Sequence, residues 1–339
     1  MDKNIWRNRS GRIPGLKVLC GAVLALALGA NLVQAAYQNP YTTTPAIQLS
    51  QTEKAAYLDR KTKALFSSKA APRQEPYVAP EGWQQDPEGW KALKLEKYTA
   101  DHKKNDKVVL QLHGGGYVLG NNDRHRDWAI ARAGAMGSGE VYMLNYRFYP
   151  EARHPAALED AVTAYQELLG SGIPAENIVV IGDSAGGNLA LALGLYLRDH
   201  HLAEPSALVL YSPWGDAGTL PSHVLNQKKD VVLGERNKFM DAAVMENKSY
   251  FQDADLKDPY VSPVYGDFHG LPPMLIFAGD DELFLDDTLL LEQRAREAGV
   301  PVETHLALGM SHDWVLMFPE LSDSKDTYPI LARFVKAVK

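Results

Sequence analysis

The stretch from Ile178 to Ala192 restricts the possible folds of this chain more than any other. It begins as a short β-branched apolar run, breaks at Gly182, presents Ser184, and continues as an Ala- and Leu-rich segment without proline. That order predicts a strand, a sharp turn and a helix. Gly182 and Gly186 flank the serine at two-residue spacing, where so tight a turn leaves no room for a Cβ. The pattern therefore predicts a nucleophile elbow, with Ser184 raised above the sheet at a helix N-terminus.

Strand and helix patterns alternate along most of the remaining chain. Besides the strand that begins at Ile178, strands are predicted at 90–99, 107–112, 140–146, 207–211, 274–278 and 302–307. Besides the helix after Ser184, helices are predicted at 52–66, 156–169, 287–298 and 328–338. Alternation of this kind predicts an α/β fold with a mostly parallel central sheet covered by helices on both faces.

Residues 1–35 have the composition of a secretory signal peptide. Five basic residues and one acidic residue precede Val18, and 18–30 is uninterruptedly apolar or small. This run is shorter than the roughly 20 residues that span a bilayer comfortably. Val33-Gln34-Ala35 offers residues small enough for cleavage, so we expect a cleaved leader and a secreted or periplasmic protein. An uncleaved membrane anchor is the alternative.

The composition limits the redox chemistry and the partners of the processed chain. The single cysteine, Cys20, falls within the leader, so the processed chain would have no disulfide and no thiol chemistry. The net charge is -7, and removing the basic leader leaves -11. An acidic body argues against nucleic acid and anionic membrane surfaces as partners. No stable membrane association is expected once the leader is cleaved.

Two segments interrupt the regular alternation and are predicted to form a cap over the sheet. The N-terminal segment 36–89 is weakly patterned, and we expect it to be part of this cap. The interval from about 214 to 269 is too long for a simple crossover between strands. It is expected to be an insertion above the C-terminal strand ends, where open α/β sheets bind ligands. Residues 90–339 would form the catalytic domain that carries this insertion.

A second glycine-rich stretch, His113-Gly114-Gly115-Gly116, directly follows the predicted strand at 107–112. Three consecutive glycines allow backbone N–H groups to approach a ligand oxygen without obstruction by side chains. This arrangement suits an oxyanion hole. His113 itself is expected to brace the loop through hydrogen bonds and to transfer no proton.

The two glycine-rich motifs, 113–116 and Gly182-Asp183-Ser184-Ala185-Gly186-Gly187, together resemble the hormone-sensitive-lipase-like branch of the α/β-hydrolase superfamily. Segments 146–151, 155–160 and 262–265 are also similar to that branch. The likeness runs from about residue 90 to the C-terminus and fades over 37–89. It implies an α/β-hydrolase fold with a helical cap, a serine esterase activity and no cofactor.

The order of the catalytic triad in this fold is serine, acid, histidine. His312 follows the predicted strand at 302–307, and we expect it to be the general base. The acid is expected in Gly-Asp-Asp-Glu-Leu at 279–283, which follows the strand at 274–278. The resemblance favours Asp281 over the alternative Asp280.

The resemblance also places the oxyanion-hole donors at the backbone N–H groups of Gly115, Gly116 and Ala185. His113, Gly114, Gly182, Asp183 and Gly186 are expected to support these groups. The other histidines show no metal-ligand spacing, and the acidic cluster lacks the alternation of a calcium loop, so no metal is expected.

The function expected from these features is hydrolysis of short- to medium-chain acyl esters through an acyl-enzyme intermediate. The partner would be a small-molecule ester. Two alternatives remain at this stage: a lactone or similar hydrolase with the same triad, and a non-catalytic ligand-binding relative. Similar enzymes also form dimers through the last strand and helix, which leaves a homodimer open.

Overall fold

The computed structural model describes residues 37–67, 76–86, 95–235, 237 and 249–338. The predicted signal peptide at 1–35 lies outside the described residues. Residues 36–339 form one compact unit, in which the predicted α/β organisation is confirmed.

Eight strands of the described chain form one sheet in the order β1-β2-β4-β3-β5-β6-β7-β8. β1 pairs with β2, and β2 with β4, in antiparallel fashion, and all later pairs are parallel. The strands are β1 (Trp83–Gln85), β2 (Leu95–Ala100), β3 (Val108–Leu112), β4 (Glu140–Leu144), β5 (Ile178–Asp183), β6 (Ala207–Tyr211), β7 (Met274–Gly279) and β8 (Val302–Ala307). The expected mostly parallel sheet is therefore confirmed.

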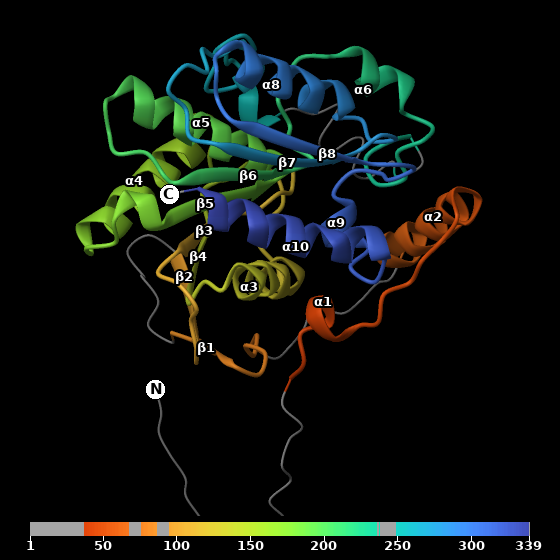
Figure 1. Cartoon of the computed structure of the whole chain (residues 1–339). Helices are drawn as coiled ribbons and strands as arrows, with labels where there is room; N and C mark the ends of the chain where they lie inside the picture. The colour runs from red at the N-terminus through yellow and green to blue at the C-terminus, as the bar shows by residue number, and fades with distance from the viewer. Residues whose placement is uncertain (1–36, 68–75, 87–94, 236, 238–248, 339) are drawn as a thin grey trace, which may run out of the picture. The chain divides into compact units, whose positions relative to one another are not determined.

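Helices cover both faces of this sheet (Figure 1). One face carries α3 (Asp123–Met136) and α10 (Ser322–Ala337), and the other carries α4 (Ala156–Gly170), α5 (Ala185–Asp199) and α8 (Leu285–Glu297). Shorter helices are α1 (Pro40–Thr43), α6 (Pro221–Leu225) and α9 (Trp314–Met317), and α2 (Gln51–Ser67) precedes the sheet in the chain.

The alternation of side chains along the strands explains the two layers. On β5, Ile178 and Val180 belong to the hydrophobic core beneath α4, α5 and α8, whereas Val179 and Ile181 belong to the core beneath α3 and α10. Successive strand residues point to opposite faces, so a strand that is covered on both sides is apolar throughout. This burial fixes β5 at the centre of the sheet, with Ser184 directly after it.

The region proposed as a cap insertion, 214–269, contains α6 and two short 3-10 turns among its described residues. Its aromatic side chains Trp214, Tyr250 and Phe251 are buried in the hydrophobic core beside α5 and do not line the cavity described below. Within the N-terminal segment, α2 is tied to the end of the chain, because Lys54 pairs with Asp323 at 2.6 Å.

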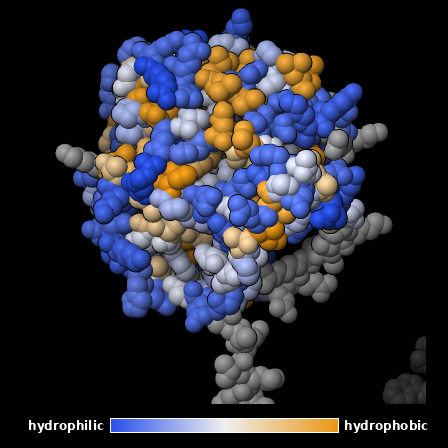
Figure 2. All heavy atoms as spheres, turned by 45° about the vertical axis from the view of Figure 1, so that its right-hand side comes forward, coloured by the Kyte–Doolittle hydropathy of each residue, from blue (hydrophilic) through white to orange (hydrophobic). Residues whose placement is uncertain are grey.

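The outer surface of the face shown in Figure 2 is mostly hydrophilic, with apolar side chains in separate patches. Exposed apolar residues of the described chain include Phe66, Leu119, Val224 and Leu225. None of the helices in the described ranges has both the length and the apolar character needed to cross a membrane.

Candidate active site

Ser184 lies in the tight turn between β5 and α5, as its flanking glycines predict. Its backbone has φ 51° and ψ -119°, a strained conformation for a residue with a Cβ. A Cβ on Gly182 would overlap the carbonyl of Gly186, and a Cβ on Gly186 would overlap the carbonyl of Leu112. The turn is held from the next strand, because the Ser184 N–H donates to the Tyr211 carbonyl at 2.9 Å. The two glycines are thus required by close contact between the elbow and its neighbours.

The glycine-rich loop after β3 is fastened to this elbow by the Asp183 side chain. Asp183 Oδ2 accepts the Gly114 N–H at 2.9 Å, and Oδ1 accepts from Gln111 at 3.3 Å. Burial raises the pKa of Asp183, but the hydrogen bond and charge of nearby His125 outweigh burial and lower it. The buried carboxylate therefore connects the residue before Ser184 with the loop that faces Ser184.

His113 lies within the same loop and supports it. Its ring is stacked on Tyr146 with centroids 4.2 Å apart, and its Nδ1 is 2.7 Å from the Gly114 carbonyl. Burial lowers its pKa to about 4, so the ring is neutral at neutral pH. These contacts agree with the expected bracing role.

The backbone N–H groups of Gly115, Gly116 and Ala185 have no hydrogen-bond acceptor recorded within the described part of the chain. Gly115 and Gly116 have φ of 117° and 62°. Ala185 is the first residue of α5, where the helix dipole favours negative charge. Unpartnered donors beside a serine can stabilise an oxyanion.

His312 follows β8 and is buried, with 2% of its surface exposed. Its Nε2 lies 3.2 Å from Asp313 Oδ2, and neither ring nitrogen has a hydrogen bond of good geometry. Burial alone would lower the pKa of His312, but the charges of Asp313, Glu282 and Asp230 outweigh burial and raise it to about 9. The imidazole is thus surrounded by carboxylates and has Nδ1 available for one of them.

Glu282 also has an unpartnered oxygen and acts on His312, as does Asp313, whose Oδ1 lacks a hydrogen-bond partner. Glu282 Oε2 accepts from the Ser212 hydroxyl at 2.7 Å and the Gly279 N–H at 3.0 Å, while Glu282 Oε1 is buried and has no partner. Burial raises the pKa of Glu282 to about 8, against the effect of the His312 charge. The unpartnered Oε1 of Glu282 and the unpartnered Nδ1 of His312 match as acceptor and donor.

Asp230 also acts on His312, but its oxygens are already occupied. They accept backbone N–H groups from Leu283 at 2.9 Å, Val232 at 2.9 Å and Leu233 at 3.1 Å, and Oδ1 is 3.4 Å from the His312 N–H. We therefore interpret Asp230 as a brace for the loops that carry Glu282 and His312.

The structure does not bring Asp281, the expected orienting carboxylate, to the imidazole. Its side chain is 34% exposed and pairs with Lys229 at 3.5 Å, while its N–H donates to the Met310 carbonyl. The alternative, Asp280, accepts the Gly309 N–H at 2.6 Å. The turn after β7 directs Asp281 outward and Glu282 inward, which makes Glu282 a second candidate for the carboxylate that orients His312.

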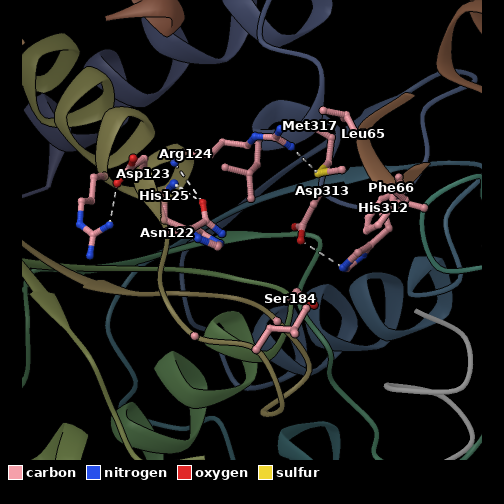
Figure 3. Close-up of a pocket in the computed structure, with 16 residues that line it drawn as sticks. Leu65, Phe66, Asn122, Asp123, Arg124, His125, Ser184, His312, Asp313 and Met317 are labelled. Carbon is pink, nitrogen blue, oxygen red and sulfur yellow. Dashed lines mark hydrogen bonds and ion pairs between the residues drawn. The ribbon is translucent and has the colours of Figure 1, made fainter. Parts of the chain in front are cut away.

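Ser184, His312 and Asp313 face one cavity of about 520 Å³ (Figure 3). The cavity is bounded by the glycine-rich loop, the start of α3, the end of α2 and the region of α9. Its apolar lining is Leu65, Phe66, Leu119, Val232, Leu316 and Met317, and its polar or glycine lining is Gly115, Gly120, Asn122, Asp123, Arg124, His125, Arg126, Ser184, His312 and Asp313. The described residues contain no cluster of three or more His, Cys, Asp or Glu able to hold a metal.

The fold and the placement of this cavity define a protein of the α/β-hydrolase class. A family model described as the alpha/beta hydrolase fold matches residues 109–316. The chain belongs to this family, within its hormone-sensitive-lipase-like esterase branch.

Curated and solved relatives agree with this membership. The chain is 37% identical over 237 residues to an acetyl-hydrolase of Streptomyces hygroscopicus, covering 69% of this chain and 77% of that protein. It matches a solved esterase of the bacterial hormone-sensitive lipase family at 30% identity and TM-score 0.73, covering 85% and 99% of the two chains. An esterase crystal soaked with p-nitrophenyl butyrate matches at 30% identity and TM-score 0.70, covering 84% and 97%. The chain is a carboxylic ester hydrolase.

Proposed function

We propose that the chain hydrolyses short- to medium-chain acyl esters through an acyl-enzyme on Ser184. The observation that carries this proposal is that Ser184, His312 and Gly115 line one cavity, while the backbone N–H groups of Gly115, Gly116 and Ala185 have no recorded acceptor in the described chain. Ser184 is the nucleophile, His312 the general base and Glu282 the carboxylate that orients the imidazole. Gly115, Gly116 and Ala185 supply the oxyanion donors.

The reaction begins when the imidazole turns its Nε2 from Asp313 toward the Ser184 hydroxyl and its Nδ1 toward Glu282 Oε1. Ser184 Oγ attacks the ester carbonyl carbon while His312 Nε2 takes the hydroxyl proton. The carbonyl oxygen becomes negative and accepts the unpartnered N–H groups, each worth on the order of 3 kcal/mol in the transition state. The intermediate collapses, the protonated imidazole gives its proton to the leaving alkoxide, and the acyl group remains on Ser184.

Deacylation repeats these steps with water as the nucleophile. His312 takes a proton from water, the hydroxide attacks the acyl carbon, and the same N–H groups hold the second oxyanion. Collapse of this intermediate releases the carboxylic acid and returns the proton to Ser184 Oγ. Apart from water, both halves of the reaction use only groups of this chain.

The preferred acyl length is tested with p-nitrophenyl esters from acetate to hexadecanoate. A cavity of about 520 Å³ is within the range of small-molecule sites. The resemblance to hormone-sensitive-lipase-like esterases implies short acyl chains, so we expect kcat/KM to be highest for short chains and to fall beyond about ten carbons. A maximum at hexadecanoate would contradict the proposed substrate range.

The pH dependence is tested with Asp313→Asn. Only the neutral imidazole can accept the serine proton, so activity rises with pH through the pKa of His312, which is raised to about 9. Asp313 is the carboxylate that raises this pKa most, so its removal is expected to move the rising limb to lower pH and increase the rate at pH 7 relative to pH 9. The control Asp281→Asn removes a surface carboxylate and should not change the pH at which activity rises. If the pH at which activity rises is the same in Asp313→Asn and in the wild type, His312 is not the general base whose pKa Asp313 raises.

A further inference from the structure

Arg124 is a cation of the cavity that the esterase mechanism does not use. It lies in the first turn of α3, and the cavity that contains Ser184 is partly lined by its side chain. Figure 3 shows its guanidinium extended toward Met317, whose Sδ lies 3.5 Å from Nη1. A thioether sulfur is a weak acceptor, while a guanidinium has five N–H donors. Most of the hydrogen-bonding capacity of Arg124 is therefore available to solvent or to a bound molecule.

The neighbouring Arg126, in contrast, has a carboxylate partner at each of its three guanidinium nitrogens. Its Nε and Nη2 form a bidentate pair with Glu96 at 2.6 and 2.7 Å, and its Nη1 contacts Asp123 at 2.9 Å. No carboxylate in the described ranges is recorded within ion-pair distance of Arg124. The acidic side chain at this end of the cavity, Asp123, is thus paired with Arg126, and the charge of Arg124 is uncompensated there.

The cavity that Arg124 shares with Ser184 also has an apolar lining suited to a chain of methylene groups. Leu65, Leu316 and Met317 belong to this lining, and so does Leu119, which follows the glycine-rich loop. Asp313, at the catalytic end, would repel an anion placed next to Ser184. An anionic group is therefore accommodated at the Arg124 end, separated from the ester by an apolar spacer.

We propose that Arg124 selects esters that carry a carboxylate at the far end of one arm, such as monoesters of dicarboxylic acids. This proposal rests on the proposed esterase function and adds a substrate class to it. The planar guanidinium fork matches a carboxylate in a bidentate arrangement. The apolar lining holds the spacer, and the ester reaches Ser184.

The test compares monoethyl with diethyl esters of succinic, glutaric, adipic and suberic acids, so that each charged substrate has a neutral partner of similar length. A second series, the acetate esters of ω-hydroxy acids and their methyl esters, places the carboxylate on the alcohol arm. The measured quantity is the ratio of kcat/KM for the charged ester to that for the neutral ester, in the wild type and in Arg124→Gln and Arg124→Lys.

We expect Arg124→Gln to lower this ratio about tenfold for at least one spacer length, with neutral esters cleaved as by the wild type. Arg124→Lys keeps the charge and should retain part of the preference. Added salt should lower the ratio in the wild type and not in Arg124→Gln. Arg333→Gln removes the same charge outside the cavity, where Arg333 pairs with Glu303, and should leave the ratio unchanged. Equal ratios in wild type and Arg124→Gln for every ester in both series would overturn the proposal.

A binding measurement separates this proposal from the proposed function. Calorimetry with Ser184→Ala and monoethyl adipate should show salt-sensitive binding that is weakened about tenfold in Ser184→Ala/Arg124→Gln. If the wild type cleaves neither neutral nor charged esters but this binding persists, the proposed function fails and the anion site stands. If neutral esters are cleaved and Arg124→Gln affects neither ratio nor binding, the anion site fails alone.

Discussion

Ser184→Ala is expected to lower kcat for p-nitrophenyl butyrate by about 10⁴-fold or more. Removal of Oγ leaves the oxyanion donors and the cavity in place, but no atom remains to form the acyl-enzyme. The fold should be preserved, since serine and alanine both place a Cβ at the strained φ of 51°, so the strain is already present in the wild type. The melting temperature of the variant should therefore stay close to that of the wild type.

The assignment of the nucleophile is checked independently by labelling. A phosphonate ester that reacts with activated serines should add one equivalent to the wild type and none to Ser184→Ala, as measured by intact mass. Asp281→Asn, a change at a surface carboxylate paired with Lys229, should be labelled like the wild type. Wild-type turnover or labelling in Ser184→Ala would show that another residue is the nucleophile.

The parts of the fold that could be predicted from the sequence are those where a local pattern and burial agree. The short, mainly apolar runs at β3, β5 and β6 are buried on both faces, as expected for central strands of a parallel sheet. The apolar periodicity of the sequence does not predict α3, because several side chains buried on this helix are polar and interrupt that periodicity. Asp127 accepts from Tyr37 and Tyr77, and Arg132 lies over the Trp128 ring at 3.5 Å. Such tertiary partners cannot be read from helical periodicity.

The boundaries of the last helices show a related limit. The sequence pattern predicts helices at 287–298 and 328–338, whereas α8 begins at Leu285 and α10 at Ser322. The first turn of α10 is held by a tertiary contact, because the Ser324 hydroxyl donates to the Phe318 carbonyl at 2.8 Å. Helix ends are set by such contacts as well as by local preference.

At the candidate site, Ser184 and His312 face the same cavity. The sequence predicts the first from its strand-turn-helix motif and the second from its place after the last strand. The carboxylate that orients His312 could not be chosen reliably from the sequence, because three acidic residues follow Gly279. Of two adjacent residues in this turn, one side chain is exposed and the other is buried. Asp281 is 34% exposed at its side chain, whereas Glu282 is fully buried. The observation that favours Glu282 is its buried oxygen without a hydrogen-bond partner, together with the unpartnered His312 nitrogen, and it requires coordinates.

Glu282→Gln is expected to lower kcat by about 10³- to 10⁴-fold, the effect of holding the histidine in the wrong tautomer. The amide oxygen can keep the hydrogen bonds from Ser212 and Gly279, so the amide nitrogen faces His312 Nδ1 as a donor. Nδ1 must then accept, the ring proton moves to Nε2, and Nε2 can no longer take the serine proton.

The matched control for Glu282→Gln is Asp281→Asn, the same chemical change one residue earlier on the exposed side of the turn. It should retain activity within about twofold, because a half-exposed ion pair contributes little. Both variants should melt near the wild-type temperature, since each substitution keeps the shape of the side chain. If Asp281→Asn loses far more activity than Glu282→Gln, the orienting carboxylate is Asp281, and the active conformation of His312 differs from that in the structure. If both retain activity, Asp230 or Asp313 stabilises the imidazolium, and Asp230→Asn and Asp313→Asn then decide between them.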